Sequence, residues 1–196
     1  EQTEAAIEAG ARHASHFYNV FPDRGDKEPG VRACGTVEAI YAHPEVSVDF
    51  ILDGEHVVPI AVKMALACKD RDKVCLISDS NVHAGLPAGK YAGVDGLGIT
   101  VAYDGAPARL ASGKLKGALS GSGLTLDKAV RNAIDMLGVD LPQAVAMASH
   151  NPAMVLGLGD TKGLVKEGYD ADLVLLDGEL KVEKCWVGGK LKYNGI

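Results

Sequence analysis

The chain has 196 residues, 47% of them hydrophobic and 23% charged, with a formal net charge of −6. This composition is typical of a globular protein with enough apolar material for a substantial core, and it argues against a nucleic-acid-binding surface, because no block of Lys or Arg offsets the negative charge. No apolar run approaches the roughly 18 residues that a membrane-spanning helix needs, so we expect no membrane-embedded segment.

The first residues show neither a signal peptide nor a transit peptide. Four cysteines without Cys-x-x-Cys spacing, at positions 34, 68, 75 and 185, favour free thiols in a reducing compartment, so we expect a cytoplasmic protein. The chain enters a helical stretch at Glu1 without an initiating Met. We therefore expect it to continue a longer polypeptide.

The first part of the chain alternates between helices and short strands. Helices are expected over 1–9, 36–43 and 59–68, and strands over 11–17, 46–52 and 73–78. Gly10 suits a helix C-cap, Pro44 stops the second helix and Pro59 fits the first turn of the third. Residues 23–30, with a Pro-Gly pair, are predicted to form a loop. Strands that are mostly apolar and alternate with helices indicate a parallel sheet covered on both faces.

Three polar residues follow these strands at equivalent places: His16, His56 and Asp79. In parallel sheets, ligands bind at the carboxyl ends of the strands. Imidazoles and a carboxylate at such an edge suggest metal-assisted hydrolysis. The alternative is that each is a structural His or an N-capping Asp. His13 precedes His16 by three positions, so strand alternation places it on the opposite face and favours a structural role.

The second part of the chain changes character. Residues 81–116 are Gly-rich, with a short strand over 98–103, and predict β-hairpins or a lid. A helix should begin after Thr125 as N-cap, with an apolar stripe, and end at Gly138. A helix over 141–149 and a short one with Asn151 as N-cap and Pro152 in its first turn should follow. Strands over 172–177, 182–187 and 190–193 predict an antiparallel meander, typical of a small separate domain.

The loops contain groups that suit an anionic substrate. Asn19, Arg24, Lys27 and His56 offer an amide and potential cations, and Ser120-Gly-Ser-Gly123 offers backbone N–H groups ahead of a helix. Together they suggest a phosphate site. The alternative is a set of solvated loop charges beside a Gly-rich turn.

Several of these stretches, in the same order, resemble the C-terminal half to two-thirds of the N-acetylglucosamine-6-phosphate deacetylases of the amidohydrolase superfamily. The more specific motifs are His16-Phe-Tyr-Asn19, Glu28-Pro-Gly30 and Asp53-Gly-Glu-His56. The others are Gly10–His16, Leu76-Ile-Ser-Asp79 with Ala84-Gly-Leu-Pro87, Gly117-Ala-Leu-Ser-Gly-Ser122 with Leu124-Thr125, Asn151-Pro-Ala153, and Gly168-Tyr-Asp-Ala-Asp-Leu173. The last two are typical of the superfamily as a whole.

The resemblance implies an α/β fold: the C-terminal part of a metal-dependent-hydrolase (β/α)8 barrel plus strands of a small β-sandwich domain. Residues 1–158 would form the barrel units, with the strands ending near His16, His56 and Asp79, a Gly-rich β insertion at about 84–118 and closing helices. Residues 159–196 would supply strands of the β-sandwich domain.

The resemblance also implies roles for single residues. His16 would bind the metal. Asp79 would be the general base and then the general acid. His56 would bind the substrate and steady its amide carbonyl. The remaining substrate contacts would come from Asn19, Val20, Lys27, Leu119, Ser120 and Gly121.

The implied reaction is the hydrolytic deacetylation of N-acetylglucosamine 6-phosphate to glucosamine 6-phosphate and acetate. The implied cofactor is a divalent metal, zinc first and iron or another divalent ion next. The implied partners are a small-molecule amino-sugar phosphate and a second copy in a homodimer, with no nucleic acid and no membrane. The alternatives are an inactive fragment or sugar-phosphate-binding protein without a complete metal site, and a related amidohydrolase for N-acetylgalactosamine 6-phosphate.

The chain departs from the family pattern in two places. Lys27 stands where the family has an Arg that grips the phosphate, and Lys neutralises a phosphate without the bidentate fork of Arg. The family's two further metal ligands, a Glu and a His that precede the part matched here, have no counterpart in this sequence. We therefore expect the chain alone neither to close a barrel nor to hold a metal tightly.

Overall fold

The computed structural model describes residues 1–21, 26–93 and 96–195, without the side chains of Asp26, Lys27 and Arg32. Its centre is a parallel sheet in the order β1 (His13–Ala14), β4 (Ser47–Ile51) and β5 (Val74–Ile77). β4 pairs with both neighbours, His13 opposite Ser47 and Val48 opposite Val74. All five residues of β4 are buried, including the polar Ser47 and Asp49.

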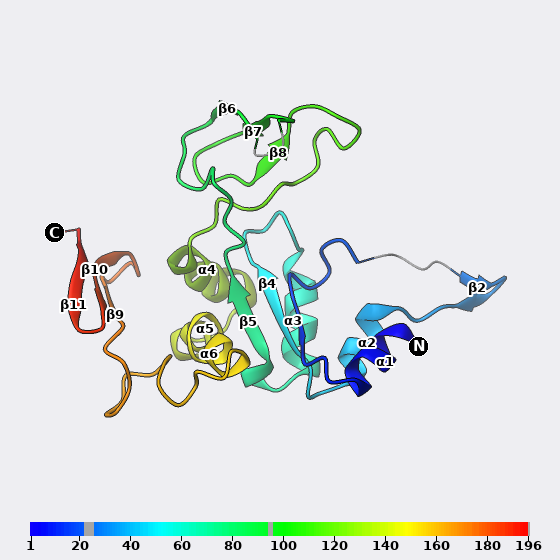
Figure 1. Cartoon of the computed structure of the whole chain (residues 1–196), viewed down its shortest axis with the longest axis horizontal. Coiled ribbons are helices and arrows are strands. Elements are labelled where there is room, and N and C mark those ends of the chain that lie inside the picture. Colours follow the sequence, from blue (N-terminus) through cyan, green and yellow to red (C-terminus); the bar gives the residue numbers. More distant parts are fainter. Residues whose placement is uncertain (22–25, 94–95, 196) are drawn as a thin grey trace.

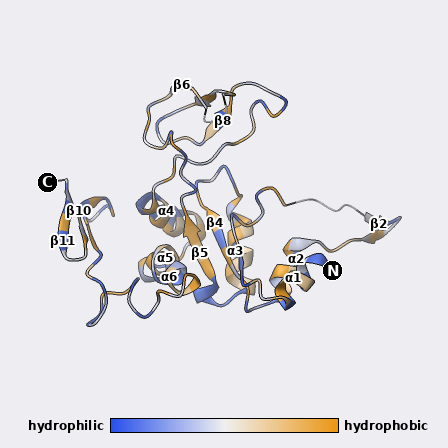
Figure 2. Ribbon diagram, viewed as in Figure 1, coloured by the Kyte–Doolittle hydropathy of each residue, from blue (hydrophilic) through white to orange (hydrophobic). Residues whose placement is uncertain are grey.

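Helices cover this sheet and share its core. α1 (Gln2–Glu8) and α2 (Thr36–Ala42) pack against each other near the N-terminus of the chain (Figure 1). α3 (Pro59–Cys68) follows β4, and a 3-10 turn at Arg71–Lys73 precedes β5. α4 (Leu126–Asn132), α5 (Leu141–Ala148) and α6 (His150–Val155) pack beside β5. Apolar residues are prominent on β5 and α3 in Figure 2, and the main core includes buried residues of β4, β5, α3, α4 and α5.

A second, smaller unit follows β5 directly. Strands β6 (Gly89–Tyr91), β7 (Ile99–Val101) and β8 (Ala108–Leu110) form an antiparallel sheet, which we call the inserted sheet. Its own core consists of Ile99, Val101, Ala106 and Ala108, separate from the main core. In Figure 1 it lies beyond the ends of β4 and β5, with one connection from β5 and the other leading to α4.

The chain ends in a third sheet. β9 (Leu173–Leu176), β10 (Val182–Val187) and β11 (Lys190–Asn194) form the predicted antiparallel meander. A two-stranded hairpin, β2 (Asp26–Glu28) with β3 (Val31–Arg32), lies at the opposite side of the molecule in Figure 1. No helix of the described residues is long and apolar enough to cross a membrane.

Several local predictions are wrong. The strand expected over 11–17 is only His13–Ala14, and the loop expected over 23–30 contains strand β2. The predicted N-cap position of Thr125 is confirmed, although its side chain makes no capping hydrogen bond. Ser149 precedes α6 instead of Asn151, whose buried Nδ2 donates to the carbonyls of Arg71 and Val74 at 2.7 and 2.8 Å. The helix that Gly138 ends passes through a π-helical turn at Ala133–Leu137.

Candidate active site

The three candidate residues follow three adjacent parallel strands. His16 lies two residues after β1, His56 five after β4 and Asp79 two after β5. Because the strands are parallel and β4 is the middle one, these carboxyl-terminal segments leave the sheet at the same edge, with neighbouring strands about 4.8 Å apart. The sheet order therefore brings the predicted segments together.

His16 lies in a tight turn whose backbone is fixed by β4. The φ angles of His16, Tyr18 and Val20 are +33°, +77° and +57°, in the region that non-glycine residues seldom occupy. The His16 N–H donates to Asp49 Oδ1 at 2.5 Å, and the Phe17 N–H donates to the Asp49 carbonyl at 2.9 Å. Phe17 is fully buried, so the turn is anchored on both its polar and its apolar side.

Asp49 also explains His13. The His13 ring contacts Asp49 Oδ2 through Nε2 and Ser47 Oγ through Nδ1, both at 2.8 Å. Both ring nitrogens are thus occupied, and His13 belongs to the network that supports the His16 turn. Sequence reasoning missed Asp49, although it is the single charge in a mostly apolar strand, and in the structure it is 5% exposed.

A metal ion in this site would need ligand atoms that have no other partner and that lie close together. His16 Nδ1 is buried and has no hydrogen-bond partner among the described residues, as a nitrogen reserved for a ligand would be. However, no group of three His, Cys, Asp or Glu side chains in the described part of the chain is arranged to hold an ion. Catalytic zinc sites use three protein ligands. These residues fit one ligand of a metal, not a complete site.

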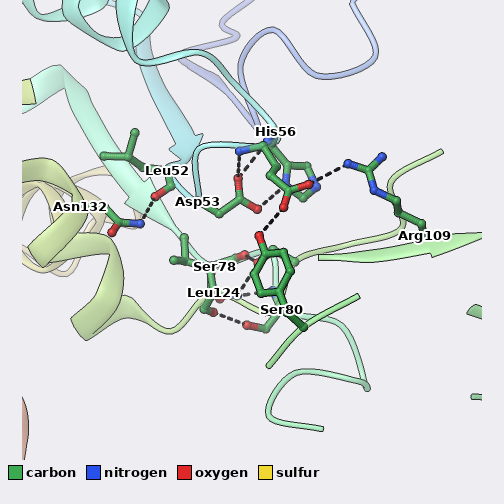
Figure 3. A network of polar contacts seen from close by, with 11 residues as sticks. Leu52, Asp53, His56, Ser78, Ser80, Arg109, Leu124 and Asn132 are labelled. Carbon is green, nitrogen blue, oxygen red and sulfur yellow. Dashed lines mark hydrogen bonds and ion pairs between the residues drawn. The ribbon is translucent and has the colours of Figure 1, made fainter. Parts of the chain in front are cut away.

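His56 is held by Asp53 from the same turn. His56 Nδ1 lies 2.6 Å from Asp53 Oδ2, and the two side chains are 4% and 6% exposed (Figure 3). Asp53 Oδ1 accepts from the backbone N–H groups of Glu55 and His56 at 2.9 Å. Burial alone would raise the pKa of Asp53, but hydrogen bonds from the His56 ring and from these two N–H groups lower it below its ordinary 3.8.

This pair gives an acid-stability prediction. Because the pKa of Asp53 is lower in the folded protein, its contribution to stability is present above the unfolded pKa and is lost as pH falls through the folded pKa. Urea unfolding of the wild type should show the free energy of unfolding falling below about pH 4. Asp53→Asn should be less stable at neutral pH and should show a flatter fall. Parallel curves for the two proteins would contradict the assignment.

Asp79 has an exposed carboxylate on a fixed backbone. Its φ is +45°, and its carbonyl accepts from the Ser122 N–H at 3.0 Å. In the described part of the chain its carboxylate makes no hydrogen bond or ion pair. The neighbouring Ser80 Oγ donates to the Leu124 carbonyl at 2.7 Å (Figure 3). Asp79 is therefore open to a ligand while its backbone is held.

The predicted substrate loop at Leu119–Gly121 is joined to the same place. Asn81 Nδ2 donates to the Ser120 carbonyl at 2.6 Å, and the Ser120 N–H donates to the Ala108 carbonyl at 2.8 Å. Gly121 has φ +68°, and a Cβ there would lie 2.7 Å from the Asn81 Cβ, so only glycine permits this approach. The loop is thus fixed between Asp79 and the inserted sheet.

The remaining predicted phosphate contacts are less defined. The Asn19 N–H donates to the His16 carbonyl at 2.9 Å, so Asn19 shares the His16 turn. Val20 is 89% exposed. Arg24 lies outside the described residues, as does the side chain of Lys27, which is in strand β2. The described structure therefore places Asn19 and Val20 beside His16 and leaves the loop cations as sequence predictions.

Comparison with known proteins gives a consistent result. The sequence matches the amidohydrolase family over residues 1–192. It is 36% identical over 191 residues to an N-acetylgalactosamine-6-phosphate deacetylase of Escherichia coli O157:H7, covering 97% of this chain and 47% of that protein. It is 34% identical over 194 residues to an N-acetylglucosamine-6-phosphate deacetylase of Vibrio furnissii, covering 99% and 45%.

The fold agrees with these sequence matches. The crystal structure of N-acetylglucosamine-6-phosphate deacetylase from Pasteurella multocida is similar with a TM-score of 0.84 at 28% identity, covering 98% of this chain and 47% of that one. The chain thus spans about half the length of these three proteins.

Proposed function

Because the chain belongs to the amidohydrolase family, we propose that the protein containing it hydrolyses the acetamide of N-acetylglucosamine 6-phosphate to glucosamine 6-phosphate and acetate. The observation that carries this proposal is the exposed Asp79 carboxylate, set on a fixed backbone between the His56 turn and the Leu119–Gly121 loop. Relatives named for this reaction match nearly the whole chain.

In the proposed reaction Asp79 moves a proton. It takes a proton from the attacking water and returns it to the amine as the C–N bond breaks, which leaves acetate and the free amino sugar. His56 contacts the substrate through Nε2, because Asp53 occupies Nδ1. That nitrogen accepts from a sugar hydroxyl when the ring is neutral, and donates to the amide oxygen when the ring is protonated. Backbone groups of Leu119, Ser120 and Gly121 line the sugar pocket.

The proposed cofactor is a divalent ion, with zinc first and iron or another divalent metal next. Members of the amidohydrolase superfamily generally depend on such ions. A bound ion would lower the pKa of the attacking water and polarise the carbonyl. From this chain, His16 would contribute a ligand through the unpartnered Nδ1.

The phosphate contacts are proposed for Asn19, the Val20 backbone and Lys27. A second substrate, N-acetylgalactosamine 6-phosphate, is favoured by a specific observation: a relative named for that sugar is 36% identical to the chain. The two sugars differ in the configuration of one hydroxyl, so the positions of a few polar groups decide between them.

Three further proposals rest on the same relationship. We assign residues 1–158 to the barrel part, with the inserted sheet inside it, and residues 159–196 to a small β-sandwich domain. The separate β9–β11 sheet supports the second assignment. The free cysteines fit a cytoplasmic location. A homodimer is proposed from family resemblance.

A substrate panel tests the proposed function. Acetate release should be measured with both N-acetylhexosamine 6-phosphates and with the same sugars lacking phosphate, using the full-length protein and added divalent metal. We expect kcat/KM for N-acetylglucosamine 6-phosphate to exceed that of the plain sugar at least ~10²-fold, because unpaired phosphate-binding groups penalise the sugar that lacks phosphate. Faster turnover of the galacto sugar would select the second substrate, and no acetate from either phosphate would refute the proposal.

A further inference from the structure

The inserted sheet is only narrowly joined to the rest of the molecule. Its core is separate from the main core, and the chain enters it after Asp79 and leaves it before Leu124. Between these two connecting segments, Ser80 pairs with Ser122 in a parallel bridge, and Asn81 Nδ2 donates to the Ser120 carbonyl at 2.6 Å. These contacts fix the base of the unit but do not by themselves fix the position of its body.

One side chain of the β4–α3 turn reaches the body of the inserted sheet. Glu55 accepts from the Tyr103 hydroxyl, just after β7, and from Arg109 Nη2 in β8 at 2.7 Å. Glu55 and Arg109 are 54 positions apart in the sequence. In Figure 3, Arg109 lies on the same side of the site as the His56–Asp53 pair. We call Glu55, Tyr103 and Arg109 the Glu55 clasp.

The clasp continues into the proposed substrate loop. The Arg109 backbone forms an antiparallel bridge with Leu119, and Arg109 Nη1 donates to the Gly117 carbonyl at 3.1 Å. On the other side, Glu55 is the immediate neighbour of His56. A short path of bonded groups thus joins the His56 turn to the Leu119–Gly121 loop across the carboxyl-terminal edge of the sheet.

The chemistry of the clasp is that of a charged acceptor with two donors. Hydrogen bonds from Tyr103 and then Arg109 lower the pKa of Glu55, so it stays ionised at neutral pH. Bonds to an ionised carboxylate are stronger than bonds between neutral groups. The contact is mostly exposed, so its stabilisation of the whole protein is small, and its effect should be local.

We propose that Glu55 is a positioning residue, whose clasp holds the inserted sheet against the His56 turn and so sets the spacing between His56 and the substrate loop at Leu119–Gly121. This rests on the proposed function only where it concerns the substrate. The clasp itself joins two parts of the chain whether or not a substrate is bound. Its loss should loosen substrate binding more than it slows chemistry, because Glu55 touches no reacting atom.

Hydrogen exchange tests the join without any assay of activity. In Glu55→Ala, amides of residues 99–110 should exchange about fivefold faster, while those of β4 and β5 keep the wild-type rate. Glu55→Gln keeps an acceptor and should fall between. Tyr103→Phe removes only the hydroxyl, so it should speed exchange in the wild type and add nothing in Glu55→Ala. The matched control is Glu179→Ala, which removes another exposed ion pair, with Lys181, in the β9–β11 sheet.

Kinetics of the full-length protein then separate positioning from mere stability. We expect Glu55→Ala to raise KM for the amino-sugar phosphate about three- to tenfold with kcat changed less than about twofold, and Glu179→Ala to change neither. Wild-type exchange in Glu55→Ala would overturn the clasp, and faster exchange with an unchanged KM would overturn its role in positioning. If the wild type releases no acetate from either sugar phosphate, the proposed function fails, and the exchange result still decides the clasp.

Discussion

Replacing Asp79 with Asn should reduce the proposed deacetylation by the full-length protein by ~10²–10⁴-fold, the range expected when a general acid–base group is lost. The amide neither takes a proton from water nor gives one to the leaving amine. Because Asn tolerates the left-handed backbone at least as well as Asp, the φ of +45° at this position should be kept. The loss should therefore appear in kcat with acetate release as the measurement, while far-UV circular dichroism and the thermal midpoint stay unchanged.

Asp160→Asn is the matched control for this prediction. Asp160 is also an exposed loop carboxylate, in the segment after α6, and its removal changes the net charge equally. It should retain wild-type kcat. If Asp79→Asn retains activity within a factor of a few, the proton is carried by another group and the role given to Asp79 is wrong. If Asp79→Asn unfolds the protein, the reading of Asp79 as an exposed, unpartnered side chain is wrong.

The sequence predicts best those elements that are determined by neighbouring residues in the chain. The strands β4 and β5 are short apolar runs bounded by polar residues, and their ends were placed within about two residues. α3 was placed at its observed bounds, because Pro59 marks the start. The α/β class and the parallel pairing follow from the same alternation, and they agree with the structure and with the Pasteurella multocida enzyme.

The strand expected over 11–17 failed for a non-local reason. Only some of its residues are apolar, the chain leaves the sheet after Ala14, and His16 and Tyr18 adopt left-handed backbone conformations. Asp49, more than thirty positions away, compensates by binding the His16 N–H. Local sequence preferences do not include that distant contact, so the predicted strand extends too far.

In the candidate site, too, local features were predicted and long-range contacts were not. Equivalent places after three strands indicated His16, His56 and Asp79, and the parallel order puts the segments that carry them at one edge. Their supporting residues, Asp49 and Glu55, were not found, because each acts through partners far away in the sequence. In the sequence, Asp49 is visible only as a charge inside a mostly apolar strand, and Glu55 only as an acidic residue next to His56.

Removing the Asp49 carboxylate should be the most damaging change to the framework of the site. Asp49→Ala leaves the part-buried His16 N–H and the His13 Nε2 without an acceptor, and each lost partner of this kind costs about 1–3 kcal/mol. We expect the free energy of unfolding, measured with urea, to fall by about 3 kcal/mol. Asp135→Ala, which truncates an exposed aspartate of the π-helical turn, is the control and should change it by less than about 0.5 kcal/mol.

Asp49→Asn distinguishes the hydrogen bonds from the charge. The Asn oxygen still accepts from the His16 N–H, and its NH₂ group is satisfied if His13 accepts through Nε2 and donates through Nδ1 to Ser47 Oγ, which lies 2.8 Å away. Since this tautomer leaves no buried donor unpaired, Asp49→Asn should lose less than half of what Asp49→Ala loses. Equal losses in the two variants would mean that the negative charge, and not the acceptor geometry, supports the turn that carries His16. No loss in Asp49→Ala would mean that Phe17 and its aromatic neighbours fix that turn without the carboxylate.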